Sequence, residues 1–507
     1  MSRTQNTIKN FMSSAWLHLL GTALSFVSRI VFLKILGETY LGLSGVANNA
    51  LAMLSLAEMG IGSAITFSLY KPLAENNTEK IKSIIAFYKH TYRKIALVVF
   101  CFGIALIPLL GVIISDAKKI ENFYLVFFLH VLTAASSYLI NYRATLLAAD
   151  QKNYKLITAN SVFSILTVGA KIAAVLIFKD YLAFLIASLL VPFVQRFYVH
   201  GYVGKQYPYL KDSNIIPIDK EEKNGITKNI SALFVHQIGN YCVNGTDNLI
   251  IASVLSLAVA GRYSNYLLLF TTINGIISML FNSMTSSFGN LIASNDSNHA
   301  FKVYRAADFI GFWLYGFSAV CFVCLSNPFL TLVFGKDFTF TMPVVVLLVL
   351  NNYMVGMRIP LFTVKSASGI FREDRFVPII QSVVNLVVSI VAAKLIGVAG
   401  VFLGTLVSGL LPSFYRPHLV YKKTFKLSSV LYYKEYGIRI VIITTITALM
   451  YGVCRLIFGI MPALPAFCVA TVVCGIIPNV LFFVLFRKRE EFAYLKDKIP
   501  FLRKKAA

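Results

Sequence analysis

Long apolar segments separated by short polar connections run along almost the whole chain. A membrane-spanning helix needs about 20 mostly apolar residues, and fourteen segments are long enough. The pattern therefore predicts an all-α polytopic membrane protein with about 14 transmembrane helices. The predicted spans are roughly 12–36, 41–70, 95–115, 123–149, 154–177, 181–201, 229–255, 258–286, 307–333, 342–364, 376–396, 398–420, 436–459 and 464–486.

The connections between these spans are too short to hold a soluble catalytic domain. The longest hydrophilic stretch runs from Gly204 to Lys228 and has only 25 residues. The composition agrees, because 57% of the residues are hydrophobic and only 14% are charged, against about 25% charged in soluble domains. We therefore expect function to reside within or between helices, with no catalytic residues and no cofactor.

Basic residues are distributed unevenly between the two sides of the predicted membrane. The chain has 47 Lys and Arg against 22 Asp and Glu, a formal charge of +25. With the N-terminus in the cytoplasm, 37 of the 47 fall on the cytoplasmic side and 7 outside, as the positive-inside rule requires. The charge thus predicts orientation, with both termini cytoplasmic, rather than binding of nucleic acid.

The sequence repeats itself at an offset of about 220 residues. An even shift of six spans preserves orientation, which predicts two six-helix lobes related by a pseudo-two-fold axis along the membrane normal. We place the lobes at 1–203 and 229–420, a cytoplasmic linker at 204–228, two extra helices within 421–486 and a basic tail at 487–507. Matching pairs are His18 with His236, Gly42 with Gly261, Pro108 with Pro328, Pro192 with Pro412, and Arg196 with Arg416.

Polar and charged side chains follow single helical faces inside several predicted spans. Such residues are costly in hydrocarbon and usually face protein or a watery cavity. Two facing lobes around a central site are typical of transporters, so these faces predict a substrate cavity. Glu58 and Asp247 are candidates for coupling to an ion. The predicted cavity residues are His18, Thr22, Ser25, Arg29, Asn48, Lys171, Asn240, Asn244, Asn274 and Asn282.

Each of these polar faces also has a purely structural interpretation. Ser, Thr and Asn hydrogen-bond across membrane helix bundles without binding any substrate. Arg29 can line the substrate cavity or form a buried ion pair with Asp247 or Glu58. Lys171 can extend to the outer membrane interface. The sequence leaves these alternatives open.

Two other features have simple interpretations. All seven cysteines, including the Cys321–Cys324 pair, lie in apolar segments, so we expect buried free thiols and no metal site. The segment Lys71–Lys94 carries Ile81, Ile84, Ile85, Tyr88 and Tyr92 on one helical face. It predicts an amphipathic helix lying on the cytoplasmic membrane surface.

The segments LAEMGIGSAITFSLYKPLA (Leu56–Ala74) and RIVFLKILGETYLGLSGV (Arg29–Val46) resemble the start of Wzx-type polysaccharide flippases. These proteins belong to the multidrug/oligosaccharidyl-lipid/polysaccharide (MOP) superfamily, and the resemblance extends over essentially the whole chain. It implies flipping of undecaprenyl-diphosphate-linked oligosaccharide from the inner to the outer leaflet of the bacterial cytoplasmic membrane, for surface polysaccharide biosynthesis.

The resemblance also implies a cationic central cavity and a groove for the lipid tail. It implies contact with membrane lipids, and leaves open a partnership with polysaccharide polymerase and chain-length machinery. Arg29 matches the cationic positions of such transporters. Asp247 on span 7 departs from them, and span 8 offers only Arg262, near its outer end.

Three other functions compete with this one. A multidrug exporter and a peptidoglycan-precursor flippase would share the same architecture. A membrane-embedded polysaccharide polymerase would need a large extracytoplasmic loop, and the longest predicted outer connection has about ten residues. The chain has no G-x-x-x-x-G-K-[ST] motif, which argues against ATP hydrolysis.

Overall fold

The computed structural model of the chain forms two compact units, Met1–Ser264 and Asn265–Ala507. Both are helical, and the described part of the chain contains no β-strand. The structure describes residues 21, 23–54, 65, 68–69, 72–73, 75–114, 120–150, 154–212, 216–219, 246–293, 297–368, 370, 373–374 and 376–498.

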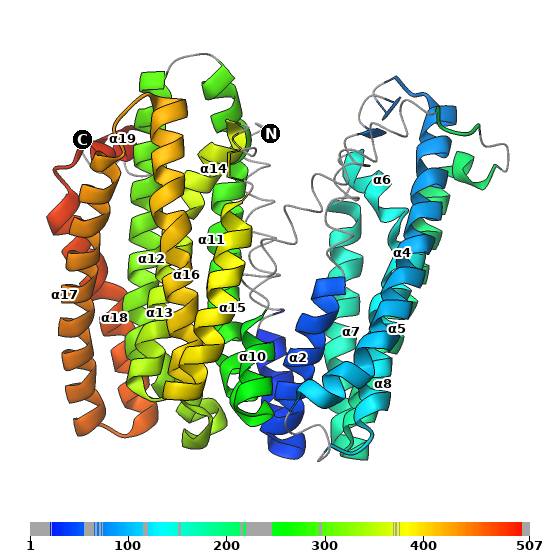
Figure 1. Ribbon diagram of the computed structural model, residues 1–507, viewed down its shortest axis with the longest axis horizontal. Helices are drawn as coiled ribbons and strands as arrows, with labels where there is room; N and C mark the ends of the chain where they lie inside the picture. The colour runs from blue at the N-terminus through cyan, green and yellow to red at the C-terminus, as the bar shows by residue number, and fades with distance from the viewer. Residues whose placement is uncertain are drawn as a thin grey trace. The chain divides into compact units, whose positions relative to one another are not determined.

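Unit 1 (Met1–Ser264) is a bundle in which α4 packs on α5, α5 on α8, and α8 on α7 (Figure 1). The shorter helix α2 packs on α4 and α5, and also on α10. Its helices are residues 23–36, α2 (Glu38–Leu54), α4 (Thr78–Ile113), α5 (Phe123–Asn141), α6 (Ala144–Ala149), α7 (Tyr154–Phe178), α8 (Tyr181–Gln206), the 3₁₀ helix η2 (Pro208–Lys211), α10 (Asp247–Val254) and the start of α11 (Leu257–Ala293).

Unit 2 (Asn265–Ala507) is organised around α12, which contacts α13, α14, α17, α18 and α19. The helices α13 and α15 pack on α16. Besides the rest of α11, the unit contains α12 (Ser297–Phe334), η3 (Lys336–Phe338), α13 (Met342–Met357), α14 (Ile359–Ala367), α15 (Val377–Ile396), α16 (Val398–Val420), the π-helical turn η4 (Tyr421–Phe425), α17 (Val430–Ile460), α18 (Ala463–Phe486) and α19 (Glu490–Lys498).

Nine helices within the described residues are long and apolar enough to cross a membrane, and α5 adds a shorter apolar helix. Their outward surfaces are also apolar. The side chains of Val112, Leu395 and Ile460 are 84%, 78% and 82% exposed. A large exposed apolar surface is unfavourable in water but is solvated by hydrocarbon. The chain is therefore a multi-pass membrane protein.

The helix contacts of unit 1 recur in unit 2. The pairs α4–α5, α5–α8 and α7–α8 correspond to α12–α13, α13–α16 and α15–α16. The matched prolines lie inside these helices, Pro108 in α4 and Pro328 in α12, and Pro192 in α8 and Pro412 in α16. The repeat is thus visible in helix contacts as well as in sequence, while the symmetry axis and the predicted lobe boundaries stay predictions.

Two spans predicted as single helices are each divided in two. In the span predicted at 123–149, α5 ends at Asn141 and α6 begins at Ala144. In the span predicted at 342–364, Arg358 separates α13 from α14. Pro360 stands in the first turn of α14, where proline is favoured because its missing N–H needs no helical partner. The breaks occupy equivalent places in the two repeats.

The expectation of a surface helix at 71–94 is wrong. Residues from Thr78 onward form the first part of α4, which continues without interruption into the predicted third span. Its apolar face is buried against protein rather than lipid: Ile84 is fully buried, and Tyr88 is 1% exposed. The partners include Leu146 of α6 and Val203 of α8. The same periodicity would suit a membrane surface, so sequence alone could not distinguish the two settings.

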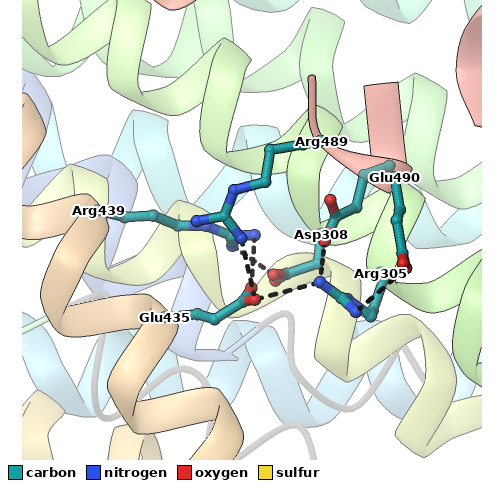
Figure 2. A network of polar contacts seen from close by, with 7 residues as sticks. Arg305, Asp308, Glu435, Arg439, Arg489 and Glu490 are labelled. Carbon is teal, nitrogen blue, oxygen red and sulfur yellow. Dashed lines mark hydrogen bonds and ion pairs between the residues drawn. The ribbon is translucent and has the colours of Figure 1, made fainter. Parts of the chain in front are cut away.

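A network of charged side chains joins α12, α17 and α19 in unit 2 (Figure 2). Arg439 of α17 forms a buried ion pair with Asp308 of α12 and also contacts Glu435 at 3.4 Å. Arg305 of α12 pairs with Glu435 at 3.2 Å and with Glu491 of α19. The network therefore attaches α17 and the C-terminal helix α19 to α12.

We expect Arg439→Ala to destabilise the protein, because it leaves the Asp308 carboxylate buried without its cation. Removing one partner of a buried pair costs about 3–5 kcal/mol. The double variant Asp308→Asn/Arg439→Gln, which removes both charges, should recover part of this loss. Thermal unfolding of the detergent-solubilised chain measures both effects; an unchanged midpoint for Arg439→Ala would contradict the expectation.

Candidate substrate site

The helices α2 and α11 approach each other very closely at a pair of glycines within unit 1. A Cβ on Gly42 would collide with the backbone of Leu257 and Gly261, and a Cβ on Gly261 would collide with the backbone of Glu38 and Gly42. Arg262 donates to Glu38 beside this crossing through Nε and Nη2, at 3.1 and 3.2 Å. The two glycines are matched by the sequence repeat, so equivalent positions of two spans meet here.

Arg29 lies at the same junction. It is half-buried on the helix 23–36, and its Nη1 donates to the carbonyl oxygen of Ser264 in α11 at 2.7 Å. The hydroxyl of Ser264 donates to Ala260 at 3.0 Å. Arg29 therefore links its own helix to the backbone of α11, a partner that sequence reasoning did not consider.

Lys171 belongs to an aromatic cluster in unit 1. Its Nζ lies 5.2 Å from the ring centroid of Phe184, a distance suited to a cation–π contact. The Phe184 ring packs edge-on against Phe32 at 4.8 Å, and Phe32 lies one helical turn after Arg29. The helix that carries Arg29 is thus linked to Lys171 through the ring contact between Phe32 and Phe184.

The other predicted residues described in unit 1 lie in different environments. Asp247 begins α10 and is only 6% exposed. Ser25 is exposed, and its hydroxyl donates to the carbonyl of Gly21 at 2.8 Å. Asn48 is exposed on α2. This bond lies within Ser25's own helix and so differs from the interhelical hydrogen bond of the structural interpretation.

Asn274 is the predicted cavity residue whose side chain is described in unit 2. Its Nδ2 donates to Oδ1 of Asn352 in α13 at 2.6 Å. The Oδ1 of Asn274 is buried and accepts no hydrogen bond within the described part of the chain. Asn274 therefore joins α11 to α13 and keeps one buried acceptor for another donor.

The remaining predicted residues cannot be placed. Asn282 is described as part of the α11 backbone, but its side chain lies outside the described residues. The structure therefore leaves the assignment of a shared cavity to these positions as a prediction. Those wholly outside the described residues are His18, Thr22, Glu58, Asn240 and Asn244.

Unit 2 contains an apolar cavity of about 730 Å³ between α12, α13, α16 and α17. This volume lies within the range of about 300–1,000 Å³ that is typical of small-molecule sites. Aliphatic and aromatic side chains line most of it, and tyrosines cluster near the first turns of α17. Its lining includes Val349, Tyr353, Leu406, Leu410, Tyr433 and Tyr436.

A cation lies near one end of this apolar cavity. Arg358, at the break between α13 and α14, interacts electrostatically with Tyr432 and Tyr436, and both tyrosines line the cavity. Its Nη1 points to the Gly409 carbonyl at 3.4 Å. The cavity thus combines an apolar body with a neighbouring guanidinium, an arrangement that suits an amphipathic anion.

Arg358 was not predicted as a site residue, because residues 358–375 were interpreted only as a basic cytoplasmic connection. Lys365 in the same stretch is fully buried. It pairs with Asp374, which also accepts from Arg416 Nε at 3.0 Å. The available signal was the acidic pair Glu373 and Asp374 in a basic segment, which indicates that nearby cations are paired.

A smaller polar pocket of about 240 Å³ lies in unit 1 and is lined by Tyr40, Glu121, Asn122 and Asp180. Burial raises the pKa of Tyr40 above its ordinary value, and the nearby carboxylates of Glu121 and Asp180 raise it further. Tyr40 therefore stays protonated at neutral pH. Two carboxylates make this pocket unsuitable for a diphosphate.

Comparison with known proteins identifies the fold. No protein-family model and no curated protein matches the sequence. Among solved structures, lipid II flippase MurJ in an inward closed conformation matches with a TM-score of 0.66 at 15% identity, covering 93% of this chain and 98% of MurJ. An inward-facing multidrug resistance MATE family transporter of the MOP superfamily matches with a TM-score of 0.61 at 12% identity, covering 80% and 98%.

The Vibrio cholerae MATE transporter VcmN in its bent form also matches, with a TM-score of 0.53 at 15% identity, covering 83% of this chain and 98% of VcmN. These similarities extend over nearly the full length of each solved chain. Together with the apolar helices and the repeated helix contacts, they show that the chain has the fold shared by the lipid II flippase MurJ and the MATE transporters.

Proposed function

We propose that the chain flips undecaprenyl-diphosphate-linked oligosaccharide from the inner to the outer leaflet of the bacterial cytoplasmic membrane, by alternating access. The observation that carries this proposal is the apolar cavity of unit 2 with Arg358 beside it. A polyprenyl diphosphate has a long apolar chain attached to an anionic group, and this combination fits the cavity better than a cationic drug does.

The physical task of such a flippase is to carry a charged sugar head through hydrocarbon. An isolated ion faces a Born cost of about 20 kcal/mol on that path. Arginine can replace the lost hydration of phosphate through paired N–H donors, and asparagine amides can do the same for sugar hydroxyls. Within unit 2, the apolar cavity suits the isoprenoid chain and Arg358 suits the attached diphosphate. Within unit 1, Arg29 and Lys171 are our candidate cations, and the predicted asparagines are our candidate donors to sugar.

Alternating access requires a contact that opens and closes on the outer side. The α2–α11 crossing at Gly42 and Gly261 is our candidate for that contact, since the predicted orientation places it at the outer ends of both spans. The Glu38–Arg262 pair would hold the crossing shut and part when the cavity opens outward. Arg29 would lose its bond to Ser264 at the same moment and so connect head-group binding to opening. Glu58 and Asp247 remain our candidates for ion or proton coupling.

A peptidoglycan-precursor flippase is the second candidate function, because lipid II flippase MurJ matches 93% of this chain. Expression in cells depleted of MurJ separates the two functions. Restored growth would favour lipid II, whereas restored surface glycan in cells lacking a polysaccharide flippase would favour the lipid-linked oligosaccharide.

We expect Arg29→Ala to abolish surface polysaccharide while the protein level in the membrane stays normal. Arg29→Lys should keep partial function, because it preserves the charge but not the forked geometry. Glycan display by immunoblot, normalised to the amount of membrane protein, measures both variants. Normal display in Arg29→Ala would remove Arg29 from the site.

We expect Ala448→Trp to block transport, because Ala448 lines the apolar cavity and a larger side chain would occupy the space of the lipid chain. The matched control is Leu449→Trp, one residue along α17, where the side chain is 55% exposed and does not line the cavity. Glycan display should fall at least tenfold in the first variant only. Equal transport by both variants would exclude a role for the cavity.

We expect a covalent link across the outer crossing to stop transport. The double variant Glu38→Cys/Arg262→Cys, joined by a short bis-methanethiosulfonate that forms a disulfide with each cysteine, should lose flipping and regain it after reduction. Each single-cysteine variant, treated in the same way, is the control for modification alone. Undiminished flipping by a fully cross-linked protein would show that this crossing does not open.

A further inference from the structure

Three cysteines that are far apart in the sequence meet in the interior of unit 2. Cys324 of α12, Cys454 of α17 and Cys474 of α18 are all buried, and their sulfur atoms lie within 4.8 Å of one another. The Sγ atoms of Cys454 and Cys474 are 3.5 Å apart. From this geometry we infer that the three thiols form a binding site for one Cu(I) ion.

The sulfur spacing suits a single shared ion. Metal–sulfur bonds are about 2.3 Å long, so three sulfurs arranged in a plane around one ion stand about 4.0 Å apart. The Cys454–Cys474 separation of 3.5 Å is slightly shorter than this value, and no pair among the three sulfurs exceeds 4.8 Å. Small changes of side-chain torsion would therefore place all three sulfurs on one ion, without moving the helices.

The ligand set selects for a soft monovalent ion. Thiolate sulfur favours Cu(I) and zinc over harder cations. Structural zinc is almost always four-coordinate, yet this group holds three ligands and, among the described residues, no His, Asp or Glu joins it. A neutral Cu(I) complex also needs the loss of only one thiol proton, which matters where water cannot solvate charge.

A fourth thiol lies on the approach to this group. Cys321 stands one helical turn before Cys324 on α12, is half-buried, and interacts electrostatically with Cys454. A metal site requires an entry path as well as ligands. Cys321 can accept an incoming ion from a donor and pass it to the three buried sulfurs by exchange of ligands.

An ion in this position would join α17 and α18 to α12. The pair Arg439–Asp308 already joins α17 to α12 near the start of α17, whereas Cys454 lies near the end of that helix at Ile460. Trp313 Nε1 links α12 to Asn479 of α18 at 2.7 Å. Bound Cu(I) would therefore fix the last part of α17 and the middle of α18 to α12, at a level that the ion-pair network does not reach.

The experiment is a titration of the purified full-length chain with Cu(I), supplied anaerobically as its bicinchoninate complex. We expect one equivalent to transfer to the protein and the unfolding temperature to rise. The double variant Cys454→Ser/Cys474→Ser should bind at least 100-fold more weakly. The control Cys101→Ser/Cys468→Ser changes two exposed cysteines and should bind as the unaltered chain does.

Because buried substitutions can impair folding, the single variant Cys324→Ala provides a second measurement. X-ray absorption of its copper-loaded form should show one sulfur ligand fewer than the unaltered chain. The inference fails if the unaltered chain takes up no Cu(I), or if uptake is independent of the three cysteines. It also fails if thiol counting of the freshly purified chain reveals a Cys454–Cys474 disulfide. These readouts do not depend on the transported substrate.

Discussion

Hydrocarbon offers no hydrogen-bond partners, and this constraint governs every charged group inside the chain. A charge within the bundle must find its counterpart on another helix or leave the membrane. The pairs Lys365–Asp374, Arg439–Asp308 and Glu38–Arg262 each satisfy this requirement by joining segments that the sequence separates. Polar contacts thus determine which apolar helices remain together, because apolar faces alone do not distinguish protein from lipid.

The same constraint explains how unit 2 can combine a lipid-like cavity with nearby arginines. The cavity walls are apolar, whereas Arg358 and Arg416 stand where helices break or end and find backbone or carboxylate acceptors. In the proposed function, the lipid tail of the substrate then moves from the bilayer into the apolar cavity with little change in free energy. Affinity must then come mainly from the place where the head group loses water, for which Arg358 beside the cavity is our candidate contact.

Much of the fold could be predicted from the sequence, because long apolar segments and an internal repeat are local or periodic signals. The helix breaks before Ala144 and at Arg358 were missed, since a single arginine at each break, Arg143 or Arg358, interrupts a segment that is otherwise mostly apolar. The first part of α4 was misassigned because an amphipathic face predicts burial without revealing the covering partner. Residues such as Lys365 and Arg358 were missed because the positive-inside rule already accounted for their charge.

For the candidate site, the sequence identified Arg29 and Lys171 but not what each one touches. The partner of Arg29 is a backbone carbonyl and that of Lys171 is an aromatic ring, and neither type of partner leaves a charge pattern in the sequence. The cysteine cluster is a similar case. The neighbouring Cys321 and Cys324 attract attention as a motif, yet the sulfurs that approach Cys324 come from helices more than a hundred residues away.

The glycine crossing of α2 and α11 limits how this chain can change over evolutionary time. Each glycine is pressed against the backbone of the opposite helix, so neither position can acquire a methyl group while the helices keep their separation. A substitution at one glycine would be tolerated only if the facing helix had already shifted. Gly42 and Gly261 are therefore expected to co-evolve, although more than two hundred residues separate them in the chain.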